Sequence, residues 1–368
     1  MDNILIPYSL QITMDDLGWF CGTDDRKAFG PARSGMPRRH RAEDYMAVNE
    51  LGRRLDMRIN CAFILGEWDP DNRLRKIPHF SKYGDGWDNA AHFDPHEAAR
   101  CVAVLNNAPY IDMAVHGLIH NNYTPGAEYG NTDYFYKMDG VYYPIDEKLV
   151  RQRLDAWFDL VKCHGIEKKI NSFIAPNFVY QWDFLARILK DYGILYVSTV
   201  FDRIENIDGR SLADVDNGII TIDRNFNEIP WYEVGSDPRK FRPVKGIFGC
   251  HWPNVLDMDP EGYPPVLDAW ESYFKNCGET FGIILSKDIS FSATQSIYKR
   301  FAKVTQQKEI TAVDLSDVPQ APGLGGSFYL STRNPIKEYT GCQLEEYQVH
   351  HDFINYRVTP TEKIMTFR

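Results

Sequence analysis

Residues 3–20, NILIPYSLQITMDDLGWF, decide the fold, because an apolar run ends there in two adjacent carboxylates. The apolar residues predict a buried strand, and Asp15 and Asp16 follow at its carboxyl end. Adjacent acids in such a place are costly unless a cation or hydrogen-bond donors hold them. For the pair alone, a strand-terminating turn is the simpler explanation, because Asp is common in turns. Because functional sites in α/β folds lie at the carboxyl ends of strands, polar residues at the ends of the other predicted strands are candidates for the same site.

The composition suits a globular protein that binds neither nucleic acid nor membrane. At 368 residues and 43% hydrophobic content, the chain can form one barrel with a small appendage. A net charge of -10 argues against a nucleic-acid partner, because phosphate binding needs basic patches. No apolar stretch approaches the ~18 residues of a membrane span. A carbohydrate or other small molecule is the expected partner, and the sequence leaves a homo-oligomer open.

The number and spacing of the cysteines indicate the cellular compartment of the protein. Seven are scattered along the chain without a CxxC pair, which is typical of free thiols in a reducing compartment. No signal-peptide pattern is found at the N-terminus, so a cytoplasmic location is expected. A chain trimmed of its signal peptide would look the same.

Strand, long loop and helix recur about seven times up to residue 304. After the first strand we predict strands at 58–65, 110–115, 170–175, 194–199, 218–222 and 246–250. The predicted helices are 41–57, 94–107, 146–164, 181–192, 262–276 and 292–304. This α/β pattern predicts a distorted (β/α)7-8 barrel over residues 1–305, with its site on the side of the long loops.

After residue 305 the composition and the pattern of apolar residues change. Residues 306–325 are rich in Pro and Gly and are interpreted as a linker. Residues 326–368 alternate like strands and predict a small C-terminal antiparallel β unit of three or four strands. The unit is short for an independent domain, so we expect it to pack on the barrel.

Polar groups follow several predicted strand ends: the Asp15–Asp16 pair, His116 with His120, Asn177 and His251. His116 and His120 are one turn apart if the segment is helical, and would then share a face. With one carboxylate they would form a metal site that leaves positions open for water and substrate. For the HxxxH pattern alone, a chance pair on a helix surface explains it equally well.

These motifs resemble the polysaccharide deacetylase (NodB-homology) superfamily, the glycoside hydrolase/deacetylase barrel. Its Thr-Phe-Asp-Asp-Gly motif is similar to residues 13–18, TMDDLG, and its His-x-x-x-His motif to His116–His120. A third motif, with Arg, Pro and an aromatic residue, is similar to residues 173–178, FIAPNF. A histidine at a late strand end is matched by His251. The resemblance extends from residue 3 to about residue 304 and marks a divergent member.

The resemblance implies roles for five residues. Asp16, His116 and His120 would bind a divalent metal, most often zinc. Asp15 would be the general base and His251 the general acid. The implied function is removal of acetyl groups from an N- or O-acetylated carbohydrate by a metal-bound water. The residue chemistry agrees, since hydrolysis needs a nucleophilic water, an oxyanion stabiliser and a proton donor.

One element of the family pattern is missing. Ile174 and Ala175 stand where the third motif has its Arg, which in the family orients the base. Asn177, or Arg33 or Arg38 from the first long loop, are candidate substitutes.

Residues beside the predicted strand ends are candidates for substrate binding. Trp19, Trp68 and Trp252 could stack on sugar faces, although packing in the core explains them as well. Asn177 and Glu67 are further candidates, Glu67 with the alternative of an exposed loop acid.

Two other functions stay open at this point. A related barrel could hydrolyse cyclic amides or glycosidic bonds, the latter with Asp15 and either Glu67 or Asp69 as the two carboxylates. A non-catalytic carbohydrate-binding protein on the same barrel is the other alternative.

Overall fold

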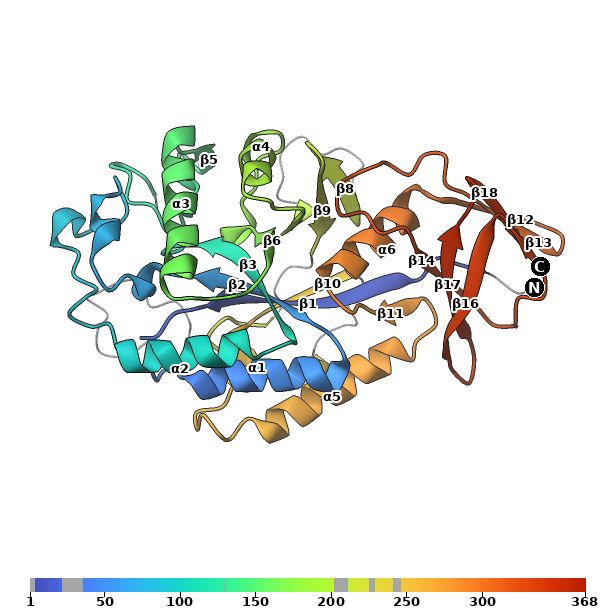
Figure 1. The fold of residues 1–368 in the computed structure, drawn as a ribbon, viewed down its shortest axis with the longest axis horizontal. Coiled ribbons are helices and arrows are strands. Elements are labelled where there is room, and N and C mark those ends of the chain that lie inside the picture. Colours follow the sequence, from blue (N-terminus) through green and yellow to red (C-terminus); the bar gives the residue numbers. More distant parts are fainter. Residues whose placement is uncertain (1–3, 22–35, 129, 202–210, 225–228, 241–245) are drawn as a thin grey trace.

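The centre of the protein is a nine-stranded sheet that curls on itself. The computed structural model describes residues 4–21, 36–128, 130–201, 211–224, 229–240 and 246–368 (Figure 1). The strand order is β10-β1-β2-β3-β6-β7-β9-β8, and β11 pairs with β1. The strands are β1 (Tyr8–Leu17), β2 (Ile59–Ile64), β3 (Ile111–Gly117), β6 (Ile170–Ile174), β7 (Tyr196–Thr199), β8 (Ala213–Asp216), β9 (Ile219–Asp223), β10 (Gly246–His251) and β11 (Ile283–Leu285).

All of these strands pair in parallel except β8, which runs antiparallel to β9. A parallel bridge between Arg224, just after β9, and Ile247 of β10 brings the two ends of the parallel series together. The α/β fold class and the distorted barrel predicted from the sequence are thus confirmed.

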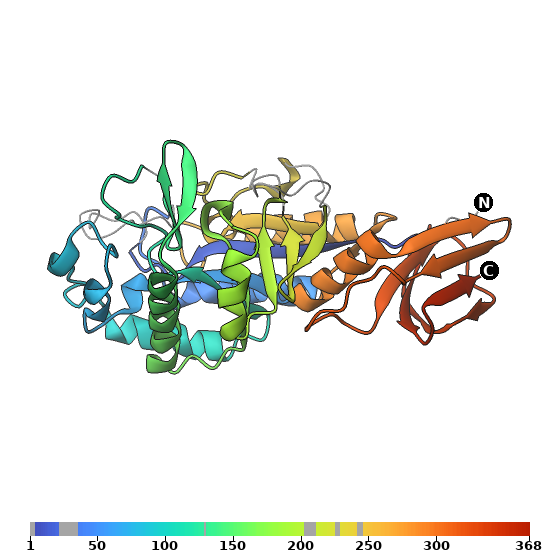
Figure 2. The same ribbon diagram turned by 90° about the horizontal axis from the view of Figure 1, so that it is seen from above.

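In the described part of the chain, six α-helices pack on the outside of the sheet (Figures 1 and 2). They are α1 (Ala42–Leu55), α2 (Pro95–Asn106), α3 (Glu147–Cys163), α4 (Phe184–Asp191), α5 (Pro264–Gly278) and α6 (Ile289–Phe301). Short 3-10 turns cover 66–68, 73–76, 84–86, 176–178, 238–240 and 252–255. The start of α2 follows from its sequence, because Asp94 accepts hydrogen bonds from the backbone N–H groups of His96 and Glu97. Among the described residues, no helix is both long enough and apolar enough to cross a membrane.

The C-terminal part contains two small antiparallel sheets, of order β12-β13-β18-β15 and β14-β17-β16. Their strands are β12 (Lys303–Gln307), β13 (Ile310–Asp314), β14 (Phe328–Thr332), β15 (Tyr339–Thr340), β16 (Cys342–Val349), β17 (Ile354–Pro360) and β18 (Ile364–Phe367). A separate hairpin joins β4 (Phe135–Met138) to β5 (Val141–Pro144).

This arrangement differs from the prediction in two respects. There are more than three or four strands, and residues 306–314 are not linker. They belong to the β12–β13 hairpin, in which Lys308 takes the left-handed φ of 54° that a tight turn requires. Val313 is fully buried in the apolar cluster of the unit, so sheet packing outweighs the polar character of the segment. The domain limits themselves stay a prediction.

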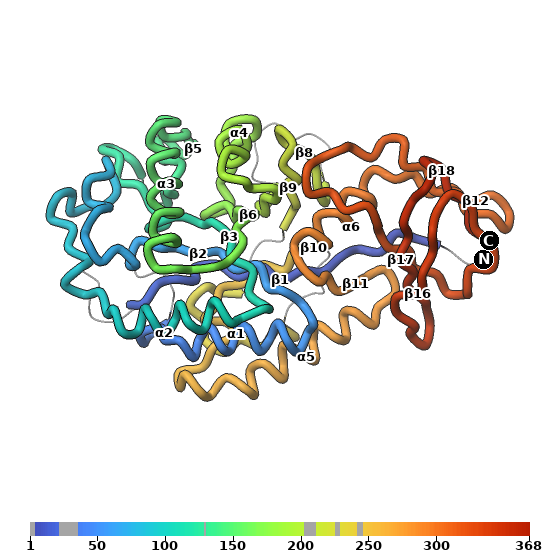
Figure 3. Tube along the Cα trace, viewed as in Figure 1, coloured from blue at the N-terminus to red at the C-terminus, as the bar shows by residue number. Residues whose placement is uncertain are grey.

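The C-terminal sheets are attached at the amino end of β1. Leu5 and Ser331 exchange two backbone hydrogen bonds, of 2.9 and 2.8 Å. Ile6 and Tyr298 of α6 complete the apolar cluster beneath the sheets. From there β1 runs into the barrel, and the Asp15–Asp16 pair lies at its other end (Figure 3). The small sheets therefore support the barrel from the end opposite to the pair.

Candidate functional site

An irregularity in β1 places the two adjacent carboxylates together. Met14 pairs with Cys61 and Leu17 with Phe63, so β1 has one residue more than β2 over this interval. Asp16 has a φ of 67°, which is rare for a residue other than Gly. In a regular strand Asp15 and Asp16 would point to opposite faces. The bulge lets both of them reach the same group of histidines.

Gly18 is required where the bulge meets β2. Its φ is 101°, and a Cβ there would collide with the carbonyl oxygen of Ile64. This requirement explains why the glycine follows the acids by two positions.

Three predicted metal ligands converge. The candidate ligand atoms of Asp16, His116 and His120 all lie within 4.8 Å of one another, and the three residues are buried. Asp16 Oδ1 is 3.6 Å from His116 Nε2, and neither buried atom has a hydrogen-bond partner in the described structure. Leaving such atoms without a partner is costly. A divalent cation would satisfy both, so these residues fit a metal.

His116 is oriented by the strand beside it. Its Nδ1 donates a hydrogen bond to the carbonyl oxygen of Ile174, at 2.7 Å. Because a carbonyl can only accept, this bond leaves Nε2 of the neutral ring free to bind a metal. The segment that resembles the third motif thus contributes a backbone oxygen at Ile174.

The His116–His120 pair is not helical, so the shared helix face expected from the spacing is wrong. His116 lies in β3 at an irregularity, since Val115 pairs with Phe63 and Gly117 with Ile64. The chain then turns, and His120 has a φ of 55°. The two rings nevertheless meet, with centroids 5.1 Å apart. A strand followed by a tight turn therefore brings the two rings together, as one helical turn was expected to do.

Asp15 is paired with Arg224, which the sequence analysis missed. Arg224 Nη1 donates to Asp15 Oδ1 at 3.0 Å, and the arginine side chain is fully buried. Of the proposed substitutes, Arg38 pairs with Asp44 at 2.6 Å, and Asn177 donates to the carbonyl oxygens of residues 130 and 131. Arg33, the third, lies outside the described residues. A signal for Arg224 was present, because it stands two residues after the apolar strand predicted at 218–222.

His251 lies opposite Asp15 in the parallel pairing of β1 and β10. Its Nε2 is 3.7 Å from Asp16 Oδ2. Its side chain is 16% exposed, against 5% for that of Asp15 and 6% for that of Asp16. His251 is therefore the most exposed of these three side chains.

The charges of the site favour ionised carboxylates. Burial raises the pKa of Asp16, but the neighbouring His116, His120 and His251 outweigh it and hold the pKa well below its usual range. Burial is likewise outweighed at Asp15, where the charges of Arg224, His116 and His251 lower the pKa. At His251 burial prevails and lowers the pKa, despite the two carboxylates. The site thus holds two anions and a neutral His251 at pH 7.

The three tryptophans predicted to stack on substrate are in the core instead. Trp19 is 1% exposed, and Trp68 and Trp252 are completely buried. Trp68 donates from Nε1 to the carbonyl oxygen of Gly18, and Trp252 stacks on His40 with ring centroids 3.6 Å apart. Their faces are covered by protein, which is the core-packing alternative.

The acids after β2 are engaged by backbone. Glu67 accepts hydrogen bonds from the N–H groups of Phe20 and Cys21, at 2.7 and 3.0 Å. Asp69 is fully buried and accepts from the N–H of Leu74 at 2.8 Å. Both carboxylates hold loops together.

An exposed aromatic pair lies in a loop that is tied to the end of β10. Trp231 is 41% and Tyr232 61% exposed, with ring centroids 5.5 Å apart. Asn254 accepts from the N–H of His251 and donates to the carbonyl oxygens of Pro230 and Glu233, at 2.8, 3.0 and 2.9 Å. No sequence signal singled out the pair, since Trp231 and Tyr232 do not adjoin a predicted strand end.

Comparison with known proteins gives distant structural matches only. No family model matches the chain, and no curated protein is similar to it. Among solved structures, a CE4 family pseudoenzyme from Bacillus anthracis is 11% identical, with 78% of this chain and 66% of that chain covered and a TM-score of 0.38. A putative polysaccharide deacetylase from Mycobacterium smegmatis is 15% identical, with coverages of 75% and 74% and a TM-score of 0.32.

A 4-alpha-glucanotransferase from Thermococcus litoralis is also similar, at 13% identity, coverages of 75% and 37% and a TM-score of 0.39. The matches thus include the type of protein that the sequence motifs resemble. At such TM-scores and identities they do not decide what the site does, which depends on its own geometry.

Proposed function

We propose that the protein is a metal-dependent hydrolase that removes acetyl groups from an N- or O-acetylated carbohydrate. The convergence of Asp16, His116 and His120, with Asp15 and His251 beside them, carries this proposal. Two imidazoles and one carboxylate suit zinc. When bound, such a cation polarises a carbonyl and makes a water molecule more acidic.

The residues around the ligands have complementary proton chemistry. Asp15 is ionised and is fixed by Arg224, so it can accept a proton from a nucleophilic water. His251 is the more exposed group and can pass a proton to a leaving amine or alcohol. Because burial lowers its pKa and leaves the ring neutral at pH 7, His251 must take up a proton before it can donate one. The proposed base is thus on β1 and the proposed acid on β10, which pair directly.

A carbohydrate substrate is supported by the exposed pair Trp231 and Tyr232. Their rings offer apolar faces and polar edges, which suits a ligand with both kinds of surface. Asn254 links their loop directly to His251. The pair therefore offers a sugar-binding surface on a loop that is bonded to the segment carrying His251.

The geometry favours acyl hydrolysis over glycosidic cleavage. Glycosidic hydrolysis usually requires two carboxylates flanking the bond. Glu67 and Asp69, the partners considered for Asp15, accept backbone hydrogen bonds instead.

Product analysis tests the proposal. Purified protein, stripped of metal and supplied with zinc or another divalent ion, is incubated with N- and O-acetylated oligosaccharides. We expect metal-dependent release of acetate, and loss of at least about 100-fold in His116→Ala. His351→Ala is the control, because that side chain is 97% exposed in the C-terminal unit.

Two results would contradict the proposal. Release of reducing sugar without acetate would indicate glycosidic cleavage. Sugar binding without turnover, across all substrates and metals, would indicate a non-catalytic binding protein.

A further inference from the structure

The turn between the two histidine ligands is held from outside the site. His120 has a left-handed φ of 55°, a conformation that costs a residue other than Gly about 1 kcal/mol or more. Such a conformation persists only when its surroundings enforce it. The contacts that do so come from Asp133 and Arg153, which the mechanism above does not use.

Asp133 contacts every residue between the two ligands. Its Oδ1 accepts hydrogen bonds from the N–H groups of Leu118 and Ile119, at 2.9 and 3.1 Å. Its carboxylate also lies where a Cβ of Gly117 would be. The turn is therefore wrapped around one buried carboxylate.

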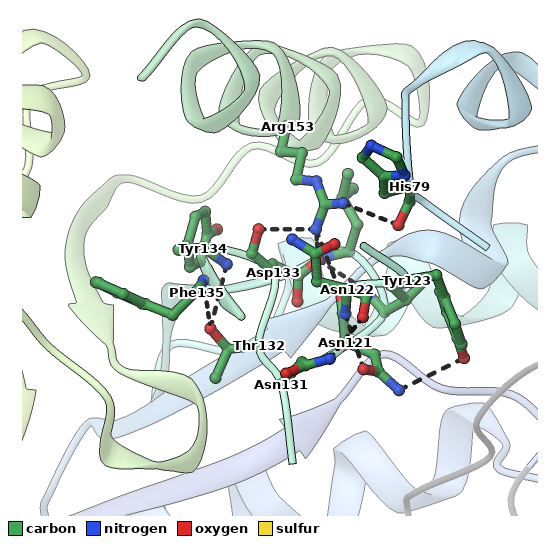
Figure 4. Close-up of polar contacts among 12 residues, drawn as sticks. His79, Asn121, Asn122, Tyr123, Asn131, Thr132, Asp133, Tyr134, Phe135 and Arg153 are labelled. Atoms are coloured by element: carbon green, nitrogen blue, oxygen red, sulfur yellow. Dashed lines mark hydrogen bonds and ion pairs between the residues drawn. The ribbon is translucent and has the colours of Figure 1, made fainter. Parts of the chain in front are cut away.

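Arg153 of α3 holds the other side of the turn (Figure 4). Its Nη1 donates to the carbonyl oxygens of Asn121, at 3.1 Å, and of Asp133, at 2.7 Å. Its Nη2 donates to the carbonyl oxygen of His79 at 3.1 Å. His120 is thus flanked by a contact to Asp133 on one side and a contact to Arg153 on the other.

The pair is not the arrangement that stability alone would favour. Both side chains are completely buried, and their nearest charged atoms are 4.0 Å apart. Within the described structure, Asp133 Oδ2 and Arg153 Nε have no hydrogen-bond partner. Apolar residues often replace buried ion pairs without loss of stability. What apolar residues could not supply is the set of hydrogen bonds that fixes the turn.

We propose that Asp133 and Arg153 are positioning residues that hold His120 in place for metal binding. The inference rests on the proposed function, because it requires that His120 is a ligand. It also couples the metal centre to the loop around His79, which contacts Arg153.

Metal affinity tests the inference on the full-length protein. Zinc binding is measured by competition with a chromogenic chelator for wild type, Asp133→Asn and a matched control, Asp216→Asn. Asp216 is equally buried and accepts hydrogen bonds from Tyr180 Oη, at 2.6 Å, and from the N–H of Asp183, at 3.2 Å. It holds a loop that carries no ligand.

The Asp133→Asn variant keeps an acceptor oxygen for Leu118 and Ile119 but loses the charge that strengthens these hydrogen bonds. We therefore expect Asp133→Asn to bind zinc about 10-fold more weakly than wild type, and Asp216→Asn to bind it with wild-type affinity. Thermal unfolding of the metal-free proteins shows whether the two variants lose similar stability. Arg153→Lys keeps the charge with one donor nitrogen, and should weaken zinc binding less than Asp133→Asn does. It provides the same test if Asp133→Asn does not fold.

The failures are distinguishable. Wild-type protein that binds no divalent metal at this site overturns the proposed function and the inference together. Wild type that binds zinc, with Asp133→Asn and Arg153→Lys of unchanged affinity, overturns the inference alone.

Discussion

At the scale of single residues, the charge of the proposed base Asp15 depends most on its contact with Arg224. The pair is buried and joins the first strand of the barrel to the end of β9. Removing one partner of a buried pair leaves the other charge uncompensated, whereas an exposed pair contributes little. The same contact gives Asp15 its lowered pKa.

Arg224→Met is expected to destabilise the protein by about 3–5 kcal/mol, because Asp15 loses its cation. Activity should fall as well, with the acid limb of the pH profile moving to higher pH as the pKa of Asp15 rises. Urea unfolding and the pH dependence of acetate release measure the two effects. Arg239→Met is the control, since Arg239 pairs with Asp237 on the surface and should change neither. Equal stability of the two variants would refute the role given to Arg224.

His40 makes stability depend on pH. Burial lowers the pKa of its ring despite the bond to Asp44, so folding favours the neutral form. Such a group binds more protons in the unfolded state, and its contribution to stability is therefore lost as pH falls below 6.5. The stability advantage of wild type over His40→Gln should shrink between pH 7 and pH 5, by at most about 1.4 kcal/mol per pH unit. A constant difference across this range would contradict the prediction.

At the scale of elements, the bulge in β1 is the device that builds the site. It turns two neighbouring residues of one strand toward the same histidines. Gly18, just after the bulge, lets the backbone of the chain pass close to the carbonyl oxygen of Ile64 in β2. The site therefore depends on backbone conformation as much as on the identity of its side chains.

Gly18→Ala should cost more than Gly140→Ala. Both glycines have a positive φ, but a Cβ at Gly140 meets no atom within 4 Å, whereas one at Gly18 collides with backbone. We expect about 1–2 kcal/mol for Gly140→Ala and a larger loss for Gly18→Ala, together with weaker zinc binding. Chemical denaturation and metal titration measure both. Identical losses in the two variants would show that the close approach to Ile64 does not matter.

At the scale of the molecule, the C-terminal sheets and the candidate metal site lie at opposite ends of β1. The C-terminal sheets share an apolar cluster with Ile6 and Tyr298, at the amino end. Of the candidate metal ligands, Asp16 is at the carboxyl end, His116 is in β3 and His120 is in the turn after β3. Damage to the first region should therefore lower stability without changing the site.

Leu330→Ala, in the fully buried cluster of the C-terminal sheets, should destabilise the protein by about 2–5 kcal/mol. Zinc affinity of the folded variant at 10 °C should equal that of wild type. Ala substitution of Ile336, which is only partly buried against the same cluster, should cost less. Loss of zinc affinity in folded Leu330→Ala would show that the sheets shape the site after all.

The sequence predicted the barrel because strand periodicity and loop lengths are local properties, and it brought together the candidate ligands Asp16, His116 and His120 because they stand at or near the ends of predicted strands. It did not reveal Arg224 as the partner of Asp15, since that contact joins residues 209 apart in sequence. The helical interpretation of the HxxxH spacing failed because the chain turns after β3, with a left-handed φ at His120, and the turn is bonded to the distant residues Asp133 and Arg153, which no local pattern specifies. The tryptophans could be taken for ligand-binding residues because burial depends on the packing of distant loops.

The central claim is that Asp16, His116 and His120 together bind one divalent metal. Anomalous diffraction at the zinc absorption edge, from crystals grown with zinc, tests it most directly. We expect one strong peak between Asp16 Oδ1, His116 Nε2 and a ring nitrogen of His120. Crystals with no anomalous peak among these three residues, at saturating zinc and neutral pH, would contradict it.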